Sequence, residues 1–172
     1  FVLSEKETPP IWFGLKFFNV FGPWEYHKGD MRSVVNKAFE QIQDNGIVRL
    51  FKSHREGFKD GEQLRDFVYV KDVCRAMVLM WECGESHQSG IYNMGTGKAR
   101  SFKDLVNATY VSLGLKPVIE YFDMPIAIRD QYQYFTQADM GKFNREFPSL
   151  KFLSLEDAIE DYVSLHLLTR KS

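Results

Sequence analysis

A few amide and basic side chains stand directly after apolar runs, where chains of alternating strands and helices place their ligands. Asn19 follows the aromatic run Ile11–Phe18. Its amide could bind a sugar hydroxyl or a phosphate, or it could cap the turn before Gly22-Pro23. Lys28 lies in the polar loop that comes next, where it could anchor a phosphate, act as a general acid/base once desolvated, or remain a solvated loop lysine. The spacing alone leaves these alternatives open.

Arg65 immediately precedes a run rich in Phe and Tyr. Its planar guanidinium suits a diphosphate, because two parallel N–H groups can bind phosphate oxygens together. A salt bridge to a nearby carboxylate, Asp66 or Asp72, would be equally ordinary. Arg65 is therefore a candidate ligand for an anion, with a structural ion pair as the alternative.

Two further segments offer polar groups for a ligand. Lys52-Ser53-His54 follows a predicted strand and could line a pocket through backbone amides and short polar groups. Tyr132 and Tyr134 alternate with glutamines and could hold a sugar, although strand aromatics of this kind could equally belong to the core. None of these segments is decisive alone.

Several kinds of chemistry are excluded by what the sequence lacks. It has no phosphate loop, no Gly-x-Gly-x-x-Gly after a strand and no nucleophile elbow, and Gly95-Thr96-Gly97 favours a plain turn. The histidines are scattered without metal-ligand spacing. The 172 residues carry a net charge of −1 and contain no long apolar stretch, so we expect neither a nucleic-acid nor a membrane partner. Cys74 and Cys83 fit a reducing cytoplasmic setting.

Hydrophobic periodicity predicts an α/β chain. Helices are expected over Met31–Asp44 with a cap at Asn45-Gly46, over Lys71–Cys83, over Phe102–Leu113 behind a Ser101/Asp104 capping box, and over Ser154–Leu168. Strands are expected over the buried run Ile11–Phe18 that Asn19 closes, and over Ile47–Phe51, Arg65–Val70, Gly90–Gly95 and Pro117–Phe122. Gln131–Phe135 alternates like a strand, and Phe1–Lys6 has the character of a helix tail.

The order of four sequence blocks resembles one family. The blocks are Phe17-Phe-Asn-Val-Phe-Gly-Pro23, His27-Lys-Gly29, Arg65-Asp-Phe-Val-Tyr-Val-Lys-Asp72 and Gly90-Ile-Tyr-Asn-Met-Gly-Thr-Gly97. Together they resemble the C-terminal half of the extended short-chain dehydrogenase/reductase family, which includes nucleotide-sugar epimerases and dehydratases. Glu25–Gly29 and Tyr132–Asp139 resemble, more narrowly, the branch of that family that acts on ADP-heptose.

This resemblance implies an NADP-dependent epimerase that inverts C6″ of ADP-heptose by oxidation and re-reduction. It implies that Lys28 is the acid/base residue, acting with the tyrosine of a Tyr-x-x-x-Lys motif, and that Lys28 and Val20 contact the cofactor. The substrate contacts that it implies are Asn19, Asp30, Lys37, Phe51, Lys52, Ser53, His54, Arg65 and Tyr132. Asp30 and Lys37 replace the usual Ser and His of the family, and a carboxylate near a diphosphate is unfavourable.

The glycine-rich fingerprint and the Tyr-x-x-x-Lys dyad are absent from these residues. We therefore expect the C-terminal part of a Rossmann-type domain, with its last strands at 11–22 and 66–95, plus a small α/β substrate-binding domain at 23–65 and 96–172. A missing N-terminal Rossmann half would bind most of the NADP, and this chain alone would be nearly inactive. Exposed sheet edges favour a homo-oligomer. Another nucleotide-sugar epimerase or dehydratase, or a non-catalytic nucleotide-sugar binding module, remain alternatives.

Overall fold

The computed structural model describes residue 4 and residues 7–169, and within them the α/β fold is confirmed. The strands are β1 (Phe13–Phe17), β2 (Asn19–Phe21), β3 (Val48–Phe51), β4 (Leu64–Tyr69), β5 (Gly90–Met94), β6 (Ala99–Ser101) and β7 (Ile119–Phe122). The helices are α1 (Val34–Asn45), α2 (Val70–Glu82), α3 (Phe102–Ser112), α4 (Ile126–Arg129), α5 (Gly141–Glu146) and α6 (Leu155–Tyr162). There are also two short 3-10 helices, the turn η2 (Tyr26–Met31) and η3 (Gly84–Ser86), and a π-helix, η4 (Val163–Leu167).

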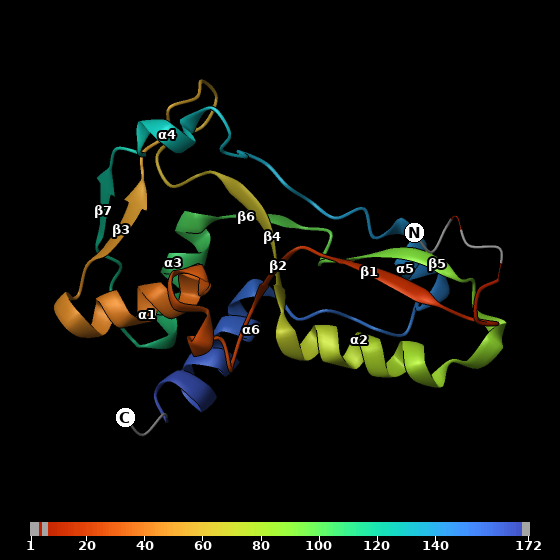
Figure 1. Cartoon of the computed structure of the whole chain (residues 1–172). Coiled ribbons are helices and arrows are strands. Elements are labelled where there is room, and N and C mark those ends of the chain that lie inside the picture. The colour runs from red at the N-terminus through yellow and green to blue at the C-terminus, as the bar shows by residue number, and fades with distance from the viewer. Residues whose placement is uncertain (1–3, 5–6, 170–172) are drawn as a thin grey trace.

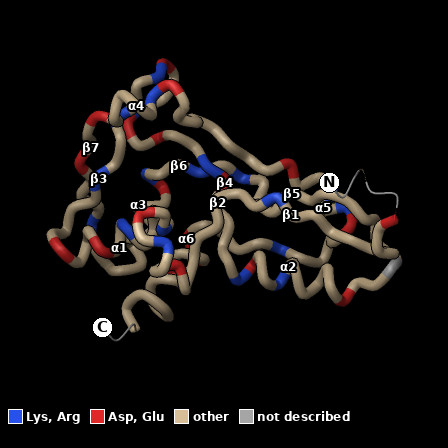
Figure 2. Tube along the Cα trace, in the orientation of Figure 1, with Lys and Arg blue, Asp and Glu red and all other residues tan. Residues whose placement is uncertain are grey.

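These elements form two lobes joined by a narrow central sheet (Figure 1). One lobe holds the parallel pair β1-β5, with α2 along one side and α5 near the strand ends. The other holds α1, α3 and α6 together with the parallel pair β3-β7. The sheet β2-β4-β6 lies between them, and basic and acidic residues are interspersed along both lobes (Figure 2).

β4 connects the two hydrophobic cores, because successive side chains of a strand point to opposite faces. Phe67 and Tyr69 pack in the core of α1, α3 and α6, whereas Val68 packs with residues of α2 and β5. The expected strand at Arg65–Val70 is thus confirmed, with bounds Leu64–Tyr69. Every residue of it from Arg65 to Tyr69 is buried.

The opening strand is not the single buried strand that the sequence predicts. It breaks at Phe18, whose amide donates to Met94 O at 3.1 Å and whose carbonyl accepts from Val20 N at 2.9 Å. β1 then pairs with β5 and β2 pairs with β4. Asn19 therefore begins the second strand and does not close the first. β1 is also only partly buried, since Phe17 is 50% exposed.

The predicted helix caps are mostly correct. Gly46 ends α1 in the left-handed conformation at φ 77°, and the Ser101/Asp104 capping box opens α3. α1, however, begins three residues later than predicted, because Ser33 caps it by accepting a hydrogen bond from Asn36 N. Met31 belongs to the preceding turn η2.

Other expectations fail or lie outside the described residues. The alternating segment Gln131–Phe135 is not a strand; it makes one isolated bridge, between Phe135 and Leu64. The short elements β6, α4 and α5 were not predicted. The expected helix tail at Phe1–Lys6 falls, apart from Ser4, outside the described part of the chain. None of the helices within residues 7–169 is both long enough and apolar enough to cross a bilayer.

Candidate functional site

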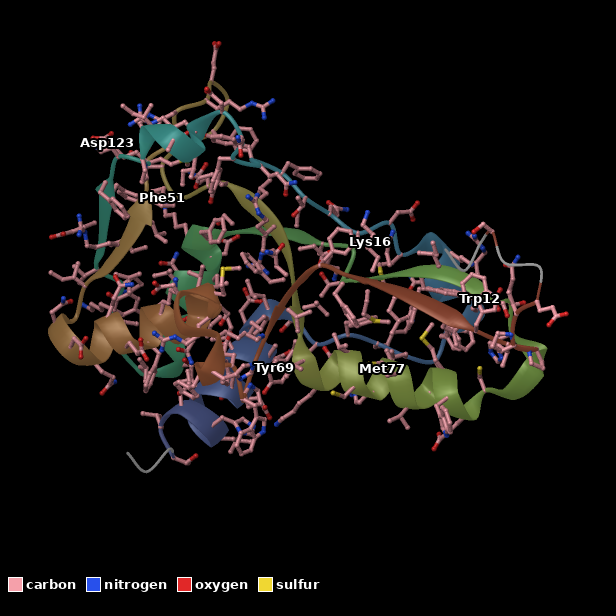
Figure 3. The ribbon with its side chains drawn as sticks, viewed as in Figure 1. Trp12, Lys16, Phe51, Tyr69, Met77 and Asp123 are labelled. Atoms are coloured by element: carbon pink, nitrogen blue, oxygen red, sulfur yellow. The ribbon has the colours of Figure 1, made fainter. Side chains whose placement is uncertain are left out.

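A cavity of about 320 Å³ lies between α1, β3 and β7, and aromatic rings form much of its wall. The rings belong to Phe51, Phe102, Phe122 and Tyr132. Phe51 lies 4.9 Å from Phe122 and 6.1 Å from Tyr132 between ring centroids, the latter pair edge-to-face. Figure 3 shows Phe51 in this lobe, with Asp123 at the end of β7 nearby. Such a slot suits a flat aromatic ligand.

Arg65 borders this cavity as a buried cation. Its residue is 8% exposed, and its guanidinium carbon lies 5.2 Å from the ring centroid of Tyr132 and 5.7 Å from that of Phe102. It donates one hydrogen bond, from Nη1 to Leu64 O at 2.8 Å. Burial lowers the pKa of the guanidinium, and burial also raises the pKa of Tyr132, an effect that the Arg65 charge opposes.

The alternative of a structural ion pair at Arg65 is wrong. Asp66 instead accepts hydrogen bonds from Thr96 N and Oγ1, Gly97 N and Ala138 N, at 2.7–3.0 Å. Asp72 pairs with Arg75 and accepts from Leu153 N. Among the described residues, no carboxylate lies within 4.0 Å of the Arg65 guanidinium. A buried cation without an anion beside an open cavity is an anion-binding arrangement.

The segment Lys52–His54 adjoins the cavity but does not offer free backbone amides. The amide of Lys52 donates to Phe122 O at 2.8 Å, that of Ser53 to Asp60 Oδ1 at 2.7 Å, and that of His54 to Tyr134 Oη at 2.9 Å. The expectation of amide contacts to a ligand is therefore wrong for this structure. Only the side chains remain, and Lys52 Nζ and His54 Nε2 both lie 3.7 Å from Asp123 Oδ1.

His54 and Tyr134 have structural partners. His54 Nε2 accepts a hydrogen bond from Met124 N at 3.2 Å, which places any proton of the neutral ring on Nδ1. Tyr134 is 5% exposed and packs against Phe58, so the core alternative is correct for this tyrosine. Tyr132, by contrast, lines the cavity.

Lys37 lines the cavity from α1, and its ammonium donates to the main-chain oxygen of Asp30. Asp30 is exposed in the turn η2 and contributes only this carbonyl to the contact. The two residues at which the sequence departs from the family pattern therefore contact each other. Their contact joins η2 to the first turn of α1.

Asn19, Val20 and Lys28 do not line the cavity. Asn19 is exposed at the start of β2, Val20 is half-buried beside its β4 partner Val68, and Lys28 is exposed in η2. No described residue accepts a hydrogen bond from Lys28 Nζ, so its ammonium is available to a ligand. The structure thus divides the predicted site residues between the cavity and a second region along β2 and η2.

A buried carboxylate holds the loop that carries Lys28. Glu25 is 3% exposed and accepts hydrogen bonds from Ser33 N and Ser33 Oγ, both at 2.6 Å, and from Tyr162 Oη at 2.9 Å. Lys28 N donates to Glu25 O at 3.0 Å. Burial and the nearby Glu25 raise the pKa of Tyr162, so its hydroxyl remains a donor. The loop is therefore fixed to the start of α1 and to α6. The sequence marked Glu25 only as part of the Glu25–Gly29 block and did not predict that it is buried.

The turn at Gly95-Thr96-Gly97 is structural, as the sequence favours. The Asp66 hydrogen bonds described above organise it. A Cβ on Gly95 would lie 2.6 Å from Ala138 Cβ and 2.9 Å from Asp66 Oδ2, so only glycine fits this approach. No group of three His, Cys, Asp or Glu side chains suited to a metal ion occurs in the described part of the chain.

Comparison with known proteins agrees with this fold. The family model described as "NAD dependent epimerase/dehydratase family" matches residues 11–95. The ADP-L-glycero-D-manno-heptose-6-epimerase of Fusobacterium nucleatum is 48% identical over 98% of this chain and 52% of that protein. The enzyme of that name from Nitratidesulfovibrio vulgaris is 49% identical over 89% of this chain and 47% of that protein.

A solved structure is also similar to this chain. The crystal structure of the Helicobacter pylori ADP-L-glycero-D-manno-heptose-6-epimerase superimposes with a TM-score of 0.74 and 31% identity, over 93% of this chain and 45% of that one. The chain spans about half the length of the curated relatives that it matches. The family resemblance of the four sequence blocks is confirmed: residues 11–95 match the NAD-dependent epimerase/dehydratase family, and nearly the whole chain aligns with the epimerases named above.

Proposed function

We propose that this chain is the substrate-binding portion of an epimerase that acts on ADP-heptose, inverting its C6″ centre from the D-glycero to the L-glycero form. The observation that carries the proposal is Arg65, a buried cation that lacks a carboxylate partner among the described residues and borders an aromatic cavity. A nucleoside diphosphate has the matching parts, a flat base and a dianionic group. The names of the relatives supply the sugar.

The proposed pose follows from the charges and rings of the cavity. The base lies among Phe51, Phe122 and Tyr132, whose rings give it apolar contacts. The diphosphate lies at Arg65, which has five N–H donors of which one is used within the described residues. The side chains of Lys52, Ser53 and His54 complete the rim, and Lys37 approaches from α1. Asp30 contacts Lys37 through its main-chain oxygen, so this contact does not involve its carboxylate.

We assign the reacting end of the substrate to the second region. Lys28 would hold or release a proton at the C6″ oxygen, because its ammonium is exposed, has no acceptor in the described chain and stands on a loop fixed by Glu25. Asn19 would orient the sugar through its exposed amide. Val20 offers an apolar contact to the nicotinamide. These residues fit a nicotinamide dinucleotide, which supplies the hydride acceptor and donor when bound, and we propose NADP as that cofactor.

The chain would contribute to two domains, as the sequence suggests. Segments 11–22 and 66–95 would complete the sheet of a cofactor domain, and segments 23–65 and 96–172 would bind the substrate. An N-terminal Rossmann half, which this chain does not contain, would bind most of the cofactor and provide the tyrosine that acts with Lys28. The complete enzyme would be a homo-oligomer.

Two measurements test this proposal. Calorimetric titration of the 172-residue chain with ADP-heptose should show saturable binding, with ADP retaining most of the affinity. Absence of saturation would contradict a substrate-binding role. Turnover assays of the complete protein should show conversion of ADP-heptose, and faster turnover of a UDP- or GDP-sugar would instead indicate a different nucleotide-sugar epimerase.

A further inference from the structure

Gln63 is a buried amide in the wall of the aromatic cavity, just before β4. It is 1% exposed, and it lines the cavity beside Phe51 and Phe102. Its Nε2 lies 3.5 Å from Phe51 O and 3.4 Å from Lys52 O. Both neighbours are carbonyl oxygens, so the amide must present its NH₂ group to them, and this fixes which way the side chain is oriented.

The same orientation leaves the oxygen of Gln63 without a donor. No described residue donates a hydrogen bond to Gln63 Oε1. Gln63 lines the cavity, and its oxygen is not among the fully buried atoms that lack a partner. An acceptor in such a wall that no protein donor reaches is open to a donor on a ligand.

The other polar groups that reach this cavity from α1 and β3 are already engaged. The ammonium of Lys37 donates to Asp30 O, and the amide of Gln41 donates to Lys37 O while accepting from Arg49 N at 2.9 Å. Arg49 itself stacks on Phe122, with its guanidinium carbon 4.6 Å from the ring centroid. Gln63 is therefore the amide in this wall whose acceptor is free to select a ligand.

We infer that Gln63 is a specificity-determining residue, which accepts a hydrogen bond from the exocyclic 6-amino group of an adenine base. Adenine carries a single N–H donor group, this amino group, so a lone acceptor among aromatic walls matches it. The inference rests on the proposed function, which places a nucleoside diphosphate in the cavity. It adds that the base is recognised through its amino group and that Gln63 recognises it.

The test compares two ligands on the unmodified chain and then repeats the comparison on a variant of Gln63. The 172-residue chain is titrated calorimetrically with ADP and with purine riboside 5′-diphosphate, which has hydrogen in place of the amino group. ADP should bind about three- to tenfold more tightly, the range expected for one neutral hydrogen bond. Gln63→Met, which keeps the length of the side chain but removes the acceptor, should bind both ligands within about twofold of each other. Gln43→Met, on the exposed face of α1, is the matched control and should keep the preference.

The outcomes separate this inference from the proposed function. Equal affinity of the unmodified chain for the two ligands would overturn the role of Gln63 while leaving nucleoside-diphosphate binding intact. A preference that survives in Gln63→Met would also overturn it, because another residue would then recognise the amino group. Failure of both ligands to saturate the chain would overturn the proposed function itself. If Gln63→Met does not fold, the comparison of the two ligands on the unmodified chain can still overturn the inference, because equal affinities would leave Gln63 no role in recognising the amino group.

Discussion

Replacing Arg65 by Met should weaken ligand binding without weakening the fold. Arg65 makes one hydrogen bond within the described chain, to Leu64 O, and stacks on Tyr132 and Phe102. The substitution loses that hydrogen bond, about 1.5–3 kcal/mol for a charged donor, and ring contacts of about 1 kcal/mol. It also removes a buried cation, whose desolvation costs several kcal/mol when no anion compensates it. These opposing contributions leave the free energy of unfolding unchanged within about 1 kcal/mol, or increased.

The affinity for the ligand, unlike the stability of the fold, should fall in Arg65→Met. A diphosphate that loses a charge-assisted hydrogen bond loses about 1.5–3 kcal/mol, which is a factor of about ten to a hundred in Kd. Calorimetric titration with ADP measures this change, and urea denaturation of the same samples measures stability. Arg145→Met, on the exposed side of α5, is the matched control. A destabilisation of Arg65→Met by more than about 3 kcal/mol with unchanged ADP affinity would refute the reasoning, because Arg65 would then be a structural residue.

Two further predictions concern stability and association. Lys71 Nζ and Tyr69 Oη each lie 2.6 Å from Asp161 Oδ2; burial opposes them, but together they hold the pKa of Asp161 below its ordinary 3.8. The resulting stabilisation is present above that value and is lost as the pH falls through the lower pKa of the folded state. In Asp161→Asn, the free energy of unfolding should therefore fall less on acidification, by at most about 1 kcal/mol. An unchanged acid limb in urea melts would contradict this. Met77 on α2 (labelled in Figure 3) is 47% exposed, and Trp81, one helical turn further on, is 89% exposed. The chain should therefore self-associate, and Met77→Lys with Trp81→Glu should reduce association in ultracentrifugation. A monodisperse wild-type monomer at high concentration would count against it.

The parts of the fold that depend on local chemistry were predictable from sequence. The Ser101/Asp104 box, the glycine that ends α1 and the serine that begins α6 each act within one helical turn, so a short window of sequence contains both partners. β4 was also readable, because Phe67, Val68 and Tyr69 are residues of the β-branched and aromatic kinds that favour strands.

The parts that depend on distant partners were not predictable. The break at Phe18 exists because the two halves of the run pair with different strands, β5 and β4, which lie far along the chain. The short strand β6 contains Arg100 and forms only because β4 offers it an edge. Likewise, the alternating pattern of Gln131–Phe135 resembles that of a strand. In the structure, Tyr132 lines the cavity and Tyr134 lies in the core, and the segment makes one isolated bridge instead of a ladder.

The candidate site likewise contains residues that were predicted from the sequence and one that was not. Arg65, Lys37, Phe51 and Tyr132 were predicted by family resemblance. Lys37, Phe51 and Tyr132 line one cavity in the structure, and Arg65 lies against the ring of Tyr132. Gln63 was not predicted, because a glutamine at the end of a polar loop has the appearance of a solvated residue. Its burial depends on the end of β3, where Phe51 and the next residue, Lys52, supply the two carbonyl oxygens that hold the amide. No local pattern contains that information.

The two adjacent charges of β4 show how the structure separates a supporting role from a binding role. Asp66 and Arg65 are both buried and point to opposite faces of the strand. Asp66 accepts four hydrogen bonds, so its charge is compensated within the protein and a ligand would have nothing to add. The guanidinium of Arg65 makes one hydrogen bond and lies against the rings of Tyr132 and Phe102, which line the cavity, so its charge is compensated only when an anion binds. Since an uncompensated buried charge is costly to keep, the asymmetry between these neighbours favours Arg65 as the group retained for a ligand.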